Sequence, residues 1–305
     1  MNYKIFRLSF LNGVHFGEGS LNESGISFMA DTLFSAMCME ALKMGNDKLE
    51  LLISNFKNGD TLISDAFPYI DDKYYIPKPN IRIRSDNNSN SVIKKMYKKT
   101  EYIDSALIDS FVEGNYPEEF LGGLSKLGKK DTRTMVSIRG NEKTEPFRVG
   151  VFSFDKTAGL YFIVGYTNYD NLVLISELMD SLEMSGIGGK RSSGLGRFTY
   201  LTVDLPEYML HRINDDRSVN MLLSLALPSE EELSGVMVNS NYTLIKRSGF
   251  IASETYADEL RKKKDIFVFK AGSCFEKTFT GDIYDVSNGG KHPVYRYARA
   301  MFIGI

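Results

Sequence analysis

The sequence has few cysteines and no long apolar run, and both shortages narrow the class of protein. Cys38 and Cys274 are its only cysteines, and neither belongs to a C-x-x-C pair. This excludes a disulfide framework and a cysteine-based metal site, and it favours a reducing, cytoplasmic location. No apolar run is long enough to span a bilayer, and charges interrupt the N-terminal stretch MNYKIFRLSFLNG. We therefore expect neither a membrane partner nor a signal peptide.

The chain also lacks an excess of positive charge. Lys and Arg total 37 against 39 Asp and Glu, which gives a net charge of −2. A freestanding protein that binds nucleic acid is usually basic overall. Any contact with nucleic acid should therefore use a local patch, and we expect it inside a larger assembly. The length of 305 residues and the hydrophobic content of 43% suit a globular protein of two domains.

The first two thirds of the chain alternate strand and helix patterns. Period-two alternation predicts strands and helical spacing of apolar residues predicts helices, with Asp31 as the N-cap of the first helix. The predicted elements are strand 3–10, helix 31–44, a hairpin of strands 133–139 and 146–154, strand 160–165, helix 171–184 and strand 198–205. With the hairpin counted as the central strand pair and strand 160–165 as an additional strand, this is the βαββαβ order that is typical of ferredoxin-like or RNA-recognition-motif domains.

The remaining segments show less regular strand and helix patterns. Residues 50–80 contain three prolines and look irregular, and the polar, Lys-rich residues 81–131 predict a flexible insertion with a short helix at about 104–112. Beyond a boundary near 205–215, the predicted elements are strands 219–226, 242–246, 266–269, 277–286 and 292–304 and a helix at 229–237. We therefore expect an α+β fold of two ferredoxin-like domains, at 1–205 and 206–305, the second degenerate.

Residues 185–198 (SGIGGKRSSGLGRF) concentrate glycine, serine and basic residues between a predicted helix and a predicted strand. A Walker A loop is excluded because Arg191 follows Lys190 where Ser or Thr is required. A dinucleotide-binding loop is excluded because the third glycine of its fingerprint would fall on Arg191. Two interpretations remain: a mobile surface turn with solvated cations, or a backbone that approaches a phosphate chain while Lys190, Arg191 and Arg197 neutralise it.

Three further stretches carry candidate functional residues. Residues 246–250 (KRSGF) suit a backbone clamp with an RNA base stacked on Phe250, and the alternative is a strand end with Phe250 in the core. Lys270 and Ser273 form a weaker version of the same pattern. His15 lies in HFGEG with no second histidine near it in sequence. We find no convincing metal pair, and we expect neither a metal nor a cofactor.

Several separate motifs occur in the order found in a known family. They are NGVHFGEGSLNESGISFMADTLFSAM (12–37), SDAFPYID (64–71), IPKPN (76–80), the glycine-rich loop, KRSGFIAS (246–253), FKAGSCFEKTFTGDIYDV (269–286) and HPVYRYARAMF (292–302). Together they resemble the RAMP superfamily of CRISPR proteins, and in particular the RAMP subunit that caps one end of type III-A (Csm-type) effector complexes. The resemblance spans nearly the whole chain, but residues 81–131 match nothing in it.

The resemblance implies a non-catalytic subunit that holds the 5′ repeat-derived tag of the CRISPR RNA (crRNA). The partners it implies are the crRNA, target RNA near the tag, the large polymerase-like subunit and the backbone RAMP subunit. The basic hairpin at about 132–154 resembles the RAMP thumb, with Arg133, Arg139 and Arg148. The related processing endoribonucleases use a histidine, so the alternative is a metal-independent endoribonuclease with His15 as general acid or base.

The expected RNA contacts lie in the first loop, the glycine-rich loop and two C-terminal segments, and none is expected to be catalytic. They are His15, Gly17, Gly188, Gly189, Lys190, Arg191, Ser192, Ser193, Gly194, Gly196, Arg197, Lys246, Arg247, Ser248, Gly249, Phe250, Lys270 and Ser273.

Overall fold

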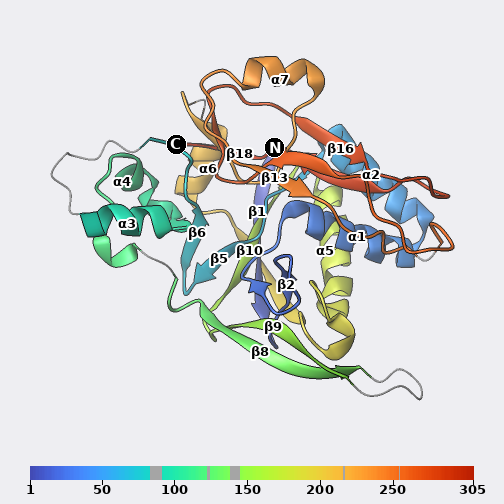
Figure 1. Cartoon of the computed structure of the whole chain (residues 1–305). Helices are drawn as coiled ribbons and strands as arrows, with labels where there is room; N and C mark the ends of the chain where they lie inside the picture. The colour runs from blue at the N-terminus through green and yellow to red at the C-terminus, as the bar shows by residue number, and fades with distance from the viewer. Residues whose placement is uncertain (83–90, 122–123, 138–144, 216, 254) are drawn as a thin grey trace.

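A long antiparallel sheet forms the centre of the computed structural model, which describes residues 1–82, 91–121, 124–137, 145–215, 217–253 and 255–305 (Figure 1). In spatial order its strands are β11 (Phe198–Asp204), β1 (Asn2–Phe10), β10 (Ala158–Tyr166), β5 (Phe67–Ile70), β6 (Lys73–Pro77) and β7 (Tyr102–Asp104), with β4 (Thr61–Ile63) also paired to β10. The first strand is thus enclosed by two strands that come much later in the chain.

Protein covers both faces of this sheet. The helices of one face are α1 (Ala30–Met44), α2 (Asn46–Asn58) and α5 (Tyr169–Ser185). Phe6 and Leu8 of β1 point into the core beneath them, whereas Ile5 points into a second core that contains Met221 of the C-terminal half. The C-terminal half therefore covers the face of β1 that lies opposite these helices.

The segment predicted as an insertion adds a strand and several short helices to the sheet's far edge. Its elements are β7, α3 (Ser91–Lys99), η1 (Ser105–Leu107), α4 (Ile108–Val112) and η2 (Glu118–Phe120). The short helix expected at about 104–112 is confirmed as η1 followed by α4. The region before it is less irregular than expected, because α2, β4, β5 and β6 lie within or overlap residues 50–80.

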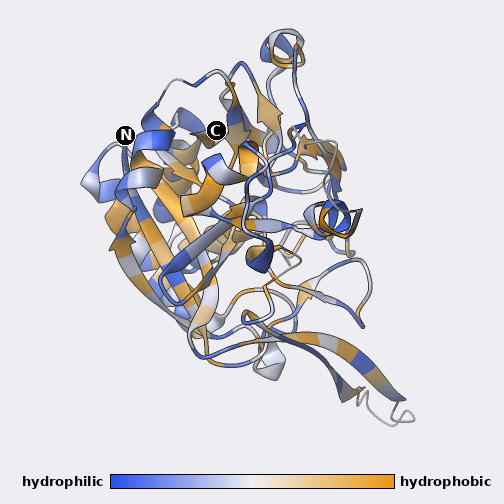
Figure 2. Ribbon diagram, turned by 90° about the vertical axis from the view of Figure 1, so that its left-hand side faces the viewer, coloured by the Kyte–Doolittle hydropathy of each residue, from blue (hydrophilic) through white to orange (hydrophobic). Residues whose placement is uncertain are grey.

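The hairpin expected to be a thumb is a long two-stranded ribbon. β8 (Gly128–Ser137) pairs with β9 (Glu145–Phe154) in a continuous antiparallel register from Gly128–Phe154 to Ser137–Glu145. Figure 2 shows the ribbon leaving the body of the molecule, whose central strands and helices carry most of the apolar residues. At its base, Val149 and Val151 pack on Leu195 of the glycine-rich loop. The thumb and the loop therefore share one small apolar cluster.

The described C-terminal half forms three small sheets instead of one four-stranded sheet. They are β15 (Cys274–Phe275)–β12 (Asn220–Leu222)–β18 (Phe302–Gly304), β13 (Leu244–Arg247)–β14 (Ile266–Phe269) and β16 (Gly281–Asp285)–β17 (Tyr295–Arg299). Two helices, α6 (Glu207–Asn214) and α7 (Glu230–Val236), accompany them. The mixed helix and strand content agrees with the expected class, while the second ferredoxin-like domain stays a prediction.

The two halves pack tightly against each other. The Tyr297 hydroxyl donates to Ile63 O at 3.1 Å and accepts from Ile63 N at 3.0 Å, and its ring lies in the N-terminal core. The boundary expected at 205–215 is mostly the helix α6, whose apolar Met209 is fully buried. None of the helices in the described part of the chain is long and apolar enough to cross a membrane.

Candidate nucleic-acid interface

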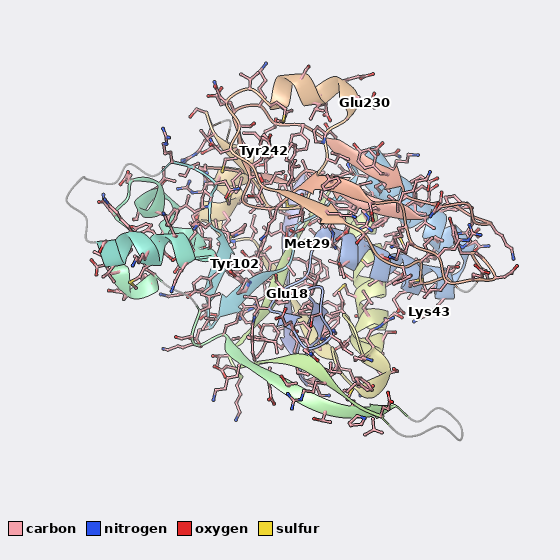
Figure 3. All side chains as sticks on the ribbon, in the orientation of Figure 1. Glu18, Met29, Lys43, Tyr102, Glu230 and Tyr242 are labelled. Carbon is pink, nitrogen blue, oxygen red and sulfur yellow. The ribbon has the colours of Figure 1, made fainter. Side chains whose placement is uncertain are left out.

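A cleft of about 770 Å³ lies where the first loop, the start of α1, the insertion and the C-terminal strands meet. Its lining includes residues of the predicted motifs, among them His15, Gly189, Arg191, Arg247, Phe250 and Lys270. Glu18, Met29 and Tyr102, which also line it, lie near the middle of the molecule in Figure 3. Segments from both ends of the chain are thus brought to one concavity.

Most glycines of the loop at 185–198 are required by its own packing. Gly186, Gly188, Gly194 and Gly196 all have φ between +75° and +96°. A Cβ at Gly196 would lie 2.0 Å from Ile187 O, and one at Gly188 would lie 2.8 Å from His15 O. Gly194 has nothing within 4 Å. The glycine content therefore serves close backbone approach within the protein at Gly188 and Gly196, and leaves only Gly194 with open space around it.

Backbone hydrogen bonds tie the glycine-rich loop to the first loop. Gly189 N donates to His15 O at 2.8 Å and Gly196 N donates to Gly13 O at 3.0 Å. The single turn η3 (Arg191–Ser193) lies between these two contacts. These bonds argue against the first interpretation, a mobile surface turn, and the approach of the loop to a phosphate chain stays a prediction.

The cations of this loop do not share one environment. Arg191 is exposed, lines the cleft and donates weakly to Gly186 O at 3.4 Å. The ammonium of Lys190 lies 4.7 Å from the centre of the Phe147 ring on the thumb. Arg197 is exposed but lies outside the cleft lining, as do Ser192 and Ser193. Only Arg191 is thus available as a cation of both the loop and the cleft.

His15 is a buried residue on the cleft wall. Its Nδ1 lies 2.7 Å from Gly150 O of β9 and its side chain is 7% exposed. A carbonyl oxygen only accepts, so Nδ1 carries a proton and Nε2 is the nitrogen left for a ligand. Among the residues lining the cleft there is no second histidine, and no group of three potential metal ligands occurs in the described residues. The hydrogen bond from Nδ1 to Gly150 O therefore connects His15 to strand β9 of the thumb.

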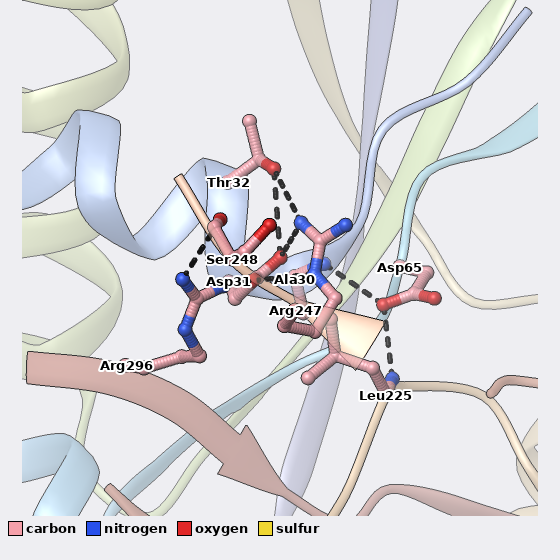
Figure 4. Close-up of polar contacts among 8 residues, drawn as sticks. All are labelled: Ala30, Asp31, Thr32, Asp65, Leu225, Arg247, Ser248 and Arg296. Atoms are coloured by element: carbon pink, nitrogen blue, oxygen red, sulfur yellow. Dashed lines mark hydrogen bonds and ion pairs between the residues drawn. The ribbon is translucent and has the colours of Figure 1, made fainter. Parts of the chain in front are cut away.

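The N-cap expected at Asp31 is wrong. α1 begins at Ala30, its N-cap is Met29, and no side chain of the cap residue bonds to the helix. The Asp65 carboxylate takes that role from outside the helix, accepting from Ala30 N at 2.8 Å and from Leu225 N at 3.0 Å (Figure 4). Burial raises the pKa of Asp65 to about 7. One side chain thereby joins the start of α1 to the C-terminal half.

Asp31 is instead the anion of a buried ionic cluster. It accepts from Nε and Nη2 of Arg247 at 2.9 and 2.7 Å, and from Nη1 of Arg296 at 2.5 Å (Figure 4). Arg296 Nη2 also donates to Ser248 O at 3.2 Å. The Asp31 and Arg296 side chains are 2% and 5% exposed. The cluster therefore fixes the backbone of residues 246–250 against the start of α1.

The segment 246–250 presents its aromatic residue to the cleft. Phe250 is 54% exposed, and the alternative that it lies in the core is wrong. Gly249 has φ of +136°, and no atom lies within 4 Å of the point that a Cβ would occupy, so there is space beside it. Lys246 lies outside the cleft lining and pairs with Asp265 at 2.7 Å. Because both residues are about half exposed, this pair is weak.

The two candidate residues of the segment 270–273 also differ in their exposure to the cleft. Lys270 is exposed and lines the cleft, whereas Ser273 is fully buried. The Ser273 hydroxyl donates to Lys270 O at 2.7 Å and accepts from Thr243 N at 3.2 Å. Our prediction that Ser273 contacts RNA is not compatible with this burial, and the residue shapes the turn that carries Lys270.

Two of the three thumb arginines, Arg133 and Arg148, lie outside the cleft lining. Arg133 and Arg148 are exposed, and they pair with Val149 and Thr134 across the ribbon, which places them on opposite faces of it. Arg139 lies outside the described residues. The ribbon can therefore present one of these two cations on each side.

Sequence reasoning missed several cations of the cleft. Lys78 of the IPKPN motif, Lys98 of the insertion and Lys263 all line it, and none of them was an expected RNA contact. Lys78 Nζ donates to Tyr97 O at 2.9 Å at the end of α3, and burial lowers its pKa. The Lys-rich composition of the insertion was a signal for Lys98, but nothing local distinguishes Lys263 from its basic neighbours.

Comparison with known proteins identifies the family. Over 308 aligned residues the chain is 38% identical to the CRISPR system Cms protein Csm4 of Mycobacterium tuberculosis, covering 100% of this chain and 98% of the relative. It is 32% identical to the protein of the same name from Streptococcus thermophilus, covering 99% and 98%. The chain belongs to the Csm4 family. Residues 215–305 also match the family model described as the CRISPR Csm4 C-terminal domain.

Solved Csm4 structures share the fold. The Csm3–Csm4 subcomplex in the type III-A CRISPR-Cas interference complex matches with a TM-score of 0.68 and 17% identity, covering 100% of this chain and 99% of the other. The Csm1–Csm4 cassette in complex with AMPPNP matches with a TM-score of 0.63 and 19% identity, covering 100% and 98%. The resemblance to a Csm subunit that the sequence motifs indicated is confirmed by the full-length relatives, and these structures show the same fold.

Proposed function

We propose that this Csm4 chain is a non-catalytic RNA-binding subunit of a type III-A effector complex, and that the cleft holds the 5′ tag of the crRNA. The observation that carries the proposal is the convergence of the first loop, the glycine-rich loop and residues 247–250 on one cleft lined by several cations. The three segments differ in local structure. What they share is that each contributes residues to the lining of this cleft.

The exposed groups of the cleft suit unpaired nucleotides. Phe250 offers a ring on which a base can stack, while Arg191, Lys98 and Lys270 lie around the same cleft and can neutralise phosphates. A tag would be recognised through splayed single-stranded bases, because the deep groove of an A-form duplex offers side chains little to read. The chain would orient the RNA and carry out no reaction on it.

Its protein partners would be the large polymerase-like subunit and the backbone RAMP subunit. The solved relatives named above are complexes of Csm4 with Csm1 and with Csm3, which supports both contacts. The order β11-β1-β10-β5, with α1 and α5 on one face, supports a ferredoxin-like first domain. The projecting thumb, with Arg133 and Arg148, would lie over target RNA near the tag.

Two arginines of the same loop test the proposal. Arg191→Ala removes a cation from the cleft lining, and Arg197→Ala removes an exposed cation of the same loop that lies outside the lining. In the assembled complex we expect Arg191→Ala to weaken retention of the guide RNA by about five-fold and to lower the salt slope of binding by about 0.7, as one lost phosphate contact predicts. Arg197→Ala should leave both unchanged. Equal effects of the two variants would show that the cleft is not the binding site.

The endoribonuclease alternative makes a different prediction. If His15 acts as a general acid or base through Nε2, the purified chain should cleave repeat RNA and His15→Ala should abolish the cleavage. That pair of results would overturn the binding-only role.

A further inference from the structure

Lys263 is a partly buried lysine of the cleft lining, whereas its two neighbouring lysines in the chain are exposed. Lys263 lines the cleft and is partly buried, and its backbone N donates to Gly249 O at 2.9 Å. Lys262, next to it, is exposed and its ammonium lies 5.6 Å from the Phe250 ring. Lys264 is exposed and lies outside the cleft lining. Of three consecutive lysines, one therefore points inward beside the 247–250 segment.

The ammonium of Lys263 has no acceptor or carboxylate bonded to it within the described residues. The nearby anion, Asp31, already accepts from Arg247 and Arg296. Burial and the charges of those two arginines lower the pKa of Lys263, against the opposing effect of Asp31. Arg296 Nε is also buried with no partner in the described structure. Buried donors normally have an acceptor. This corner of the cleft has two donors without one in the described residues, the buried Arg296 Nε and the partly buried ammonium of Lys263.

The charges of this corner do not balance. Three cations, Lys263, Arg247 and Arg296, lie near the single carboxylate of Asp31, while Asp65 is held partly neutral by a pKa of about 7. Clustered positive charge in a partly buried place costs stability unless an anion completes it. A purely solvated lysine would be exposed, as Lys264 is, and a structural lysine would have an acceptor. Neither description fits Lys263.

We propose that Lys263, backed by Arg247 and Arg296, forms an anion subsite in the cleft that binds one phosphodiester group of the RNA strand. Asp31 acts as a positioning residue there, because it holds both guanidinium groups and so leaves Lys263 as the cation that can approach the phosphate. The open space at Gly249 admits the RNA backbone beside it. This inference rests on the proposed function and names the chemical group that one part of the cleft takes.

The test replaces lysines by methionine, which keeps most of the alkyl chain and removes the charge. In complexes assembled with guide RNA, Lys263→Met should weaken guide retention by about five-fold and lower the salt slope by about 0.7. Lys263→Arg should keep both near the wild-type values. Lys264→Met, the matched control, should change neither. Because the charge of Lys263 is disfavoured in the fold, the melting temperature of Lys263→Met should equal or exceed that of the wild type.

A guide with one neutral methylphosphonate linkage, moved along the tag in successive guides, locates the contact. At one linkage the wild type should lose about as much affinity as Lys263→Met loses on natural RNA, and Lys263→Met should lose nothing further there. Unchanged retention and salt slope in Lys263→Met, with Arg191→Ala still weakening retention, would overturn the subsite and leave the proposed function standing. A lower melting temperature with unchanged retention would also overturn it. If Arg191→Ala has no effect either, the proposed function itself fails.

Discussion

The glycine-rich loop at 185–198 and the segment at 246–250 look alike in sequence but differ in what they leave available. In the loop, Gly188 and Gly196 are needed for internal packing, while Arg191 stays exposed in the cleft. In the segment, Arg247 is paired and Phe250 is exposed. Both stretches combine glycine with basic residues, and only the surrounding structure determines which of their groups can meet a ligand.

The difference comes from carboxylates contributed by distant parts of the chain. Asp31 on α1 neutralises Arg247, and Asp265 pairs with Lys246. Among the described residues, Arg191 has no such carboxylate partner. Basic residues near glycine therefore indicate a candidate phosphate contact. Where such a residue forms an ion pair with a carboxylate of the fold, its charge is already neutralised and it is less available to a phosphate.

The largest expected effect tests the buried pair of the segment. Asp31→Asn removes the one charge that balances the buried guanidinium of Arg296 and the partly buried guanidinium of Arg247, and we expect it to lower the free energy of unfolding by about 4 kcal/mol. Asp265→Asn breaks an ion pair that is about half exposed, and should cost less than about 1 kcal/mol. Urea denaturation of the two variants measures both values. Similar losses in the two variants would show that burial does not distinguish these pairs.

The next effect tests the glycines of the loop. Alanine at Gly196 would combine a left-handed φ with a Cβ 2.0 Å from a carbonyl oxygen, and we expect a loss of about 3 kcal/mol. Alanine at Gly194 has a similar φ but open space, and should cost about 1 kcal/mol. Denaturation midpoints compare the two. Equal costs would mean that backbone conformation alone, and not packing against Ile187, requires glycine here.

Local sequence patterns predicted much of the N-terminal half. The predicted helices 31–44 and 171–184 and strands 3–10, 160–165 and 198–205 agree with the structure to within a few residues. Helix α2 was missed although Leu52 and Phe56 are helically spaced, because the prolines that follow dominated the interpretation. Helix α6 was taken for a domain boundary because Pro206 precedes it and the polar run NDDR (214–217) lies at its end.

The site was predictable in its segments but not in its partners. Phe250 and Arg191, which the motifs predicted as RNA contacts, are exposed and line the cleft, and their contact with RNA stays a prediction. Asp31 looked like a cap because its partners, Arg247 and Arg296, lie more than 200 residues away, and Asp65 supplies the actual cap from another element. Ser273 looked available because nothing local shows that its turn is buried.

The smallest expected effect tests the aromatic group that the segment leaves exposed. Phe250 and Phe267 are 54% and 59% exposed, but only Phe250 lines the cleft. Phe250→Ala should weaken guide RNA retention in the assembled complex by about 1 kcal/mol, the lower end of the range for one stacked base. Phe267→Ala should leave retention unchanged, and neither variant should shift the free energy of unfolding by more than about 0.5 kcal/mol. If the two variants retain RNA equally, Phe250 does not stack on a base, and the segment at 246–250 contributes position and charge alone.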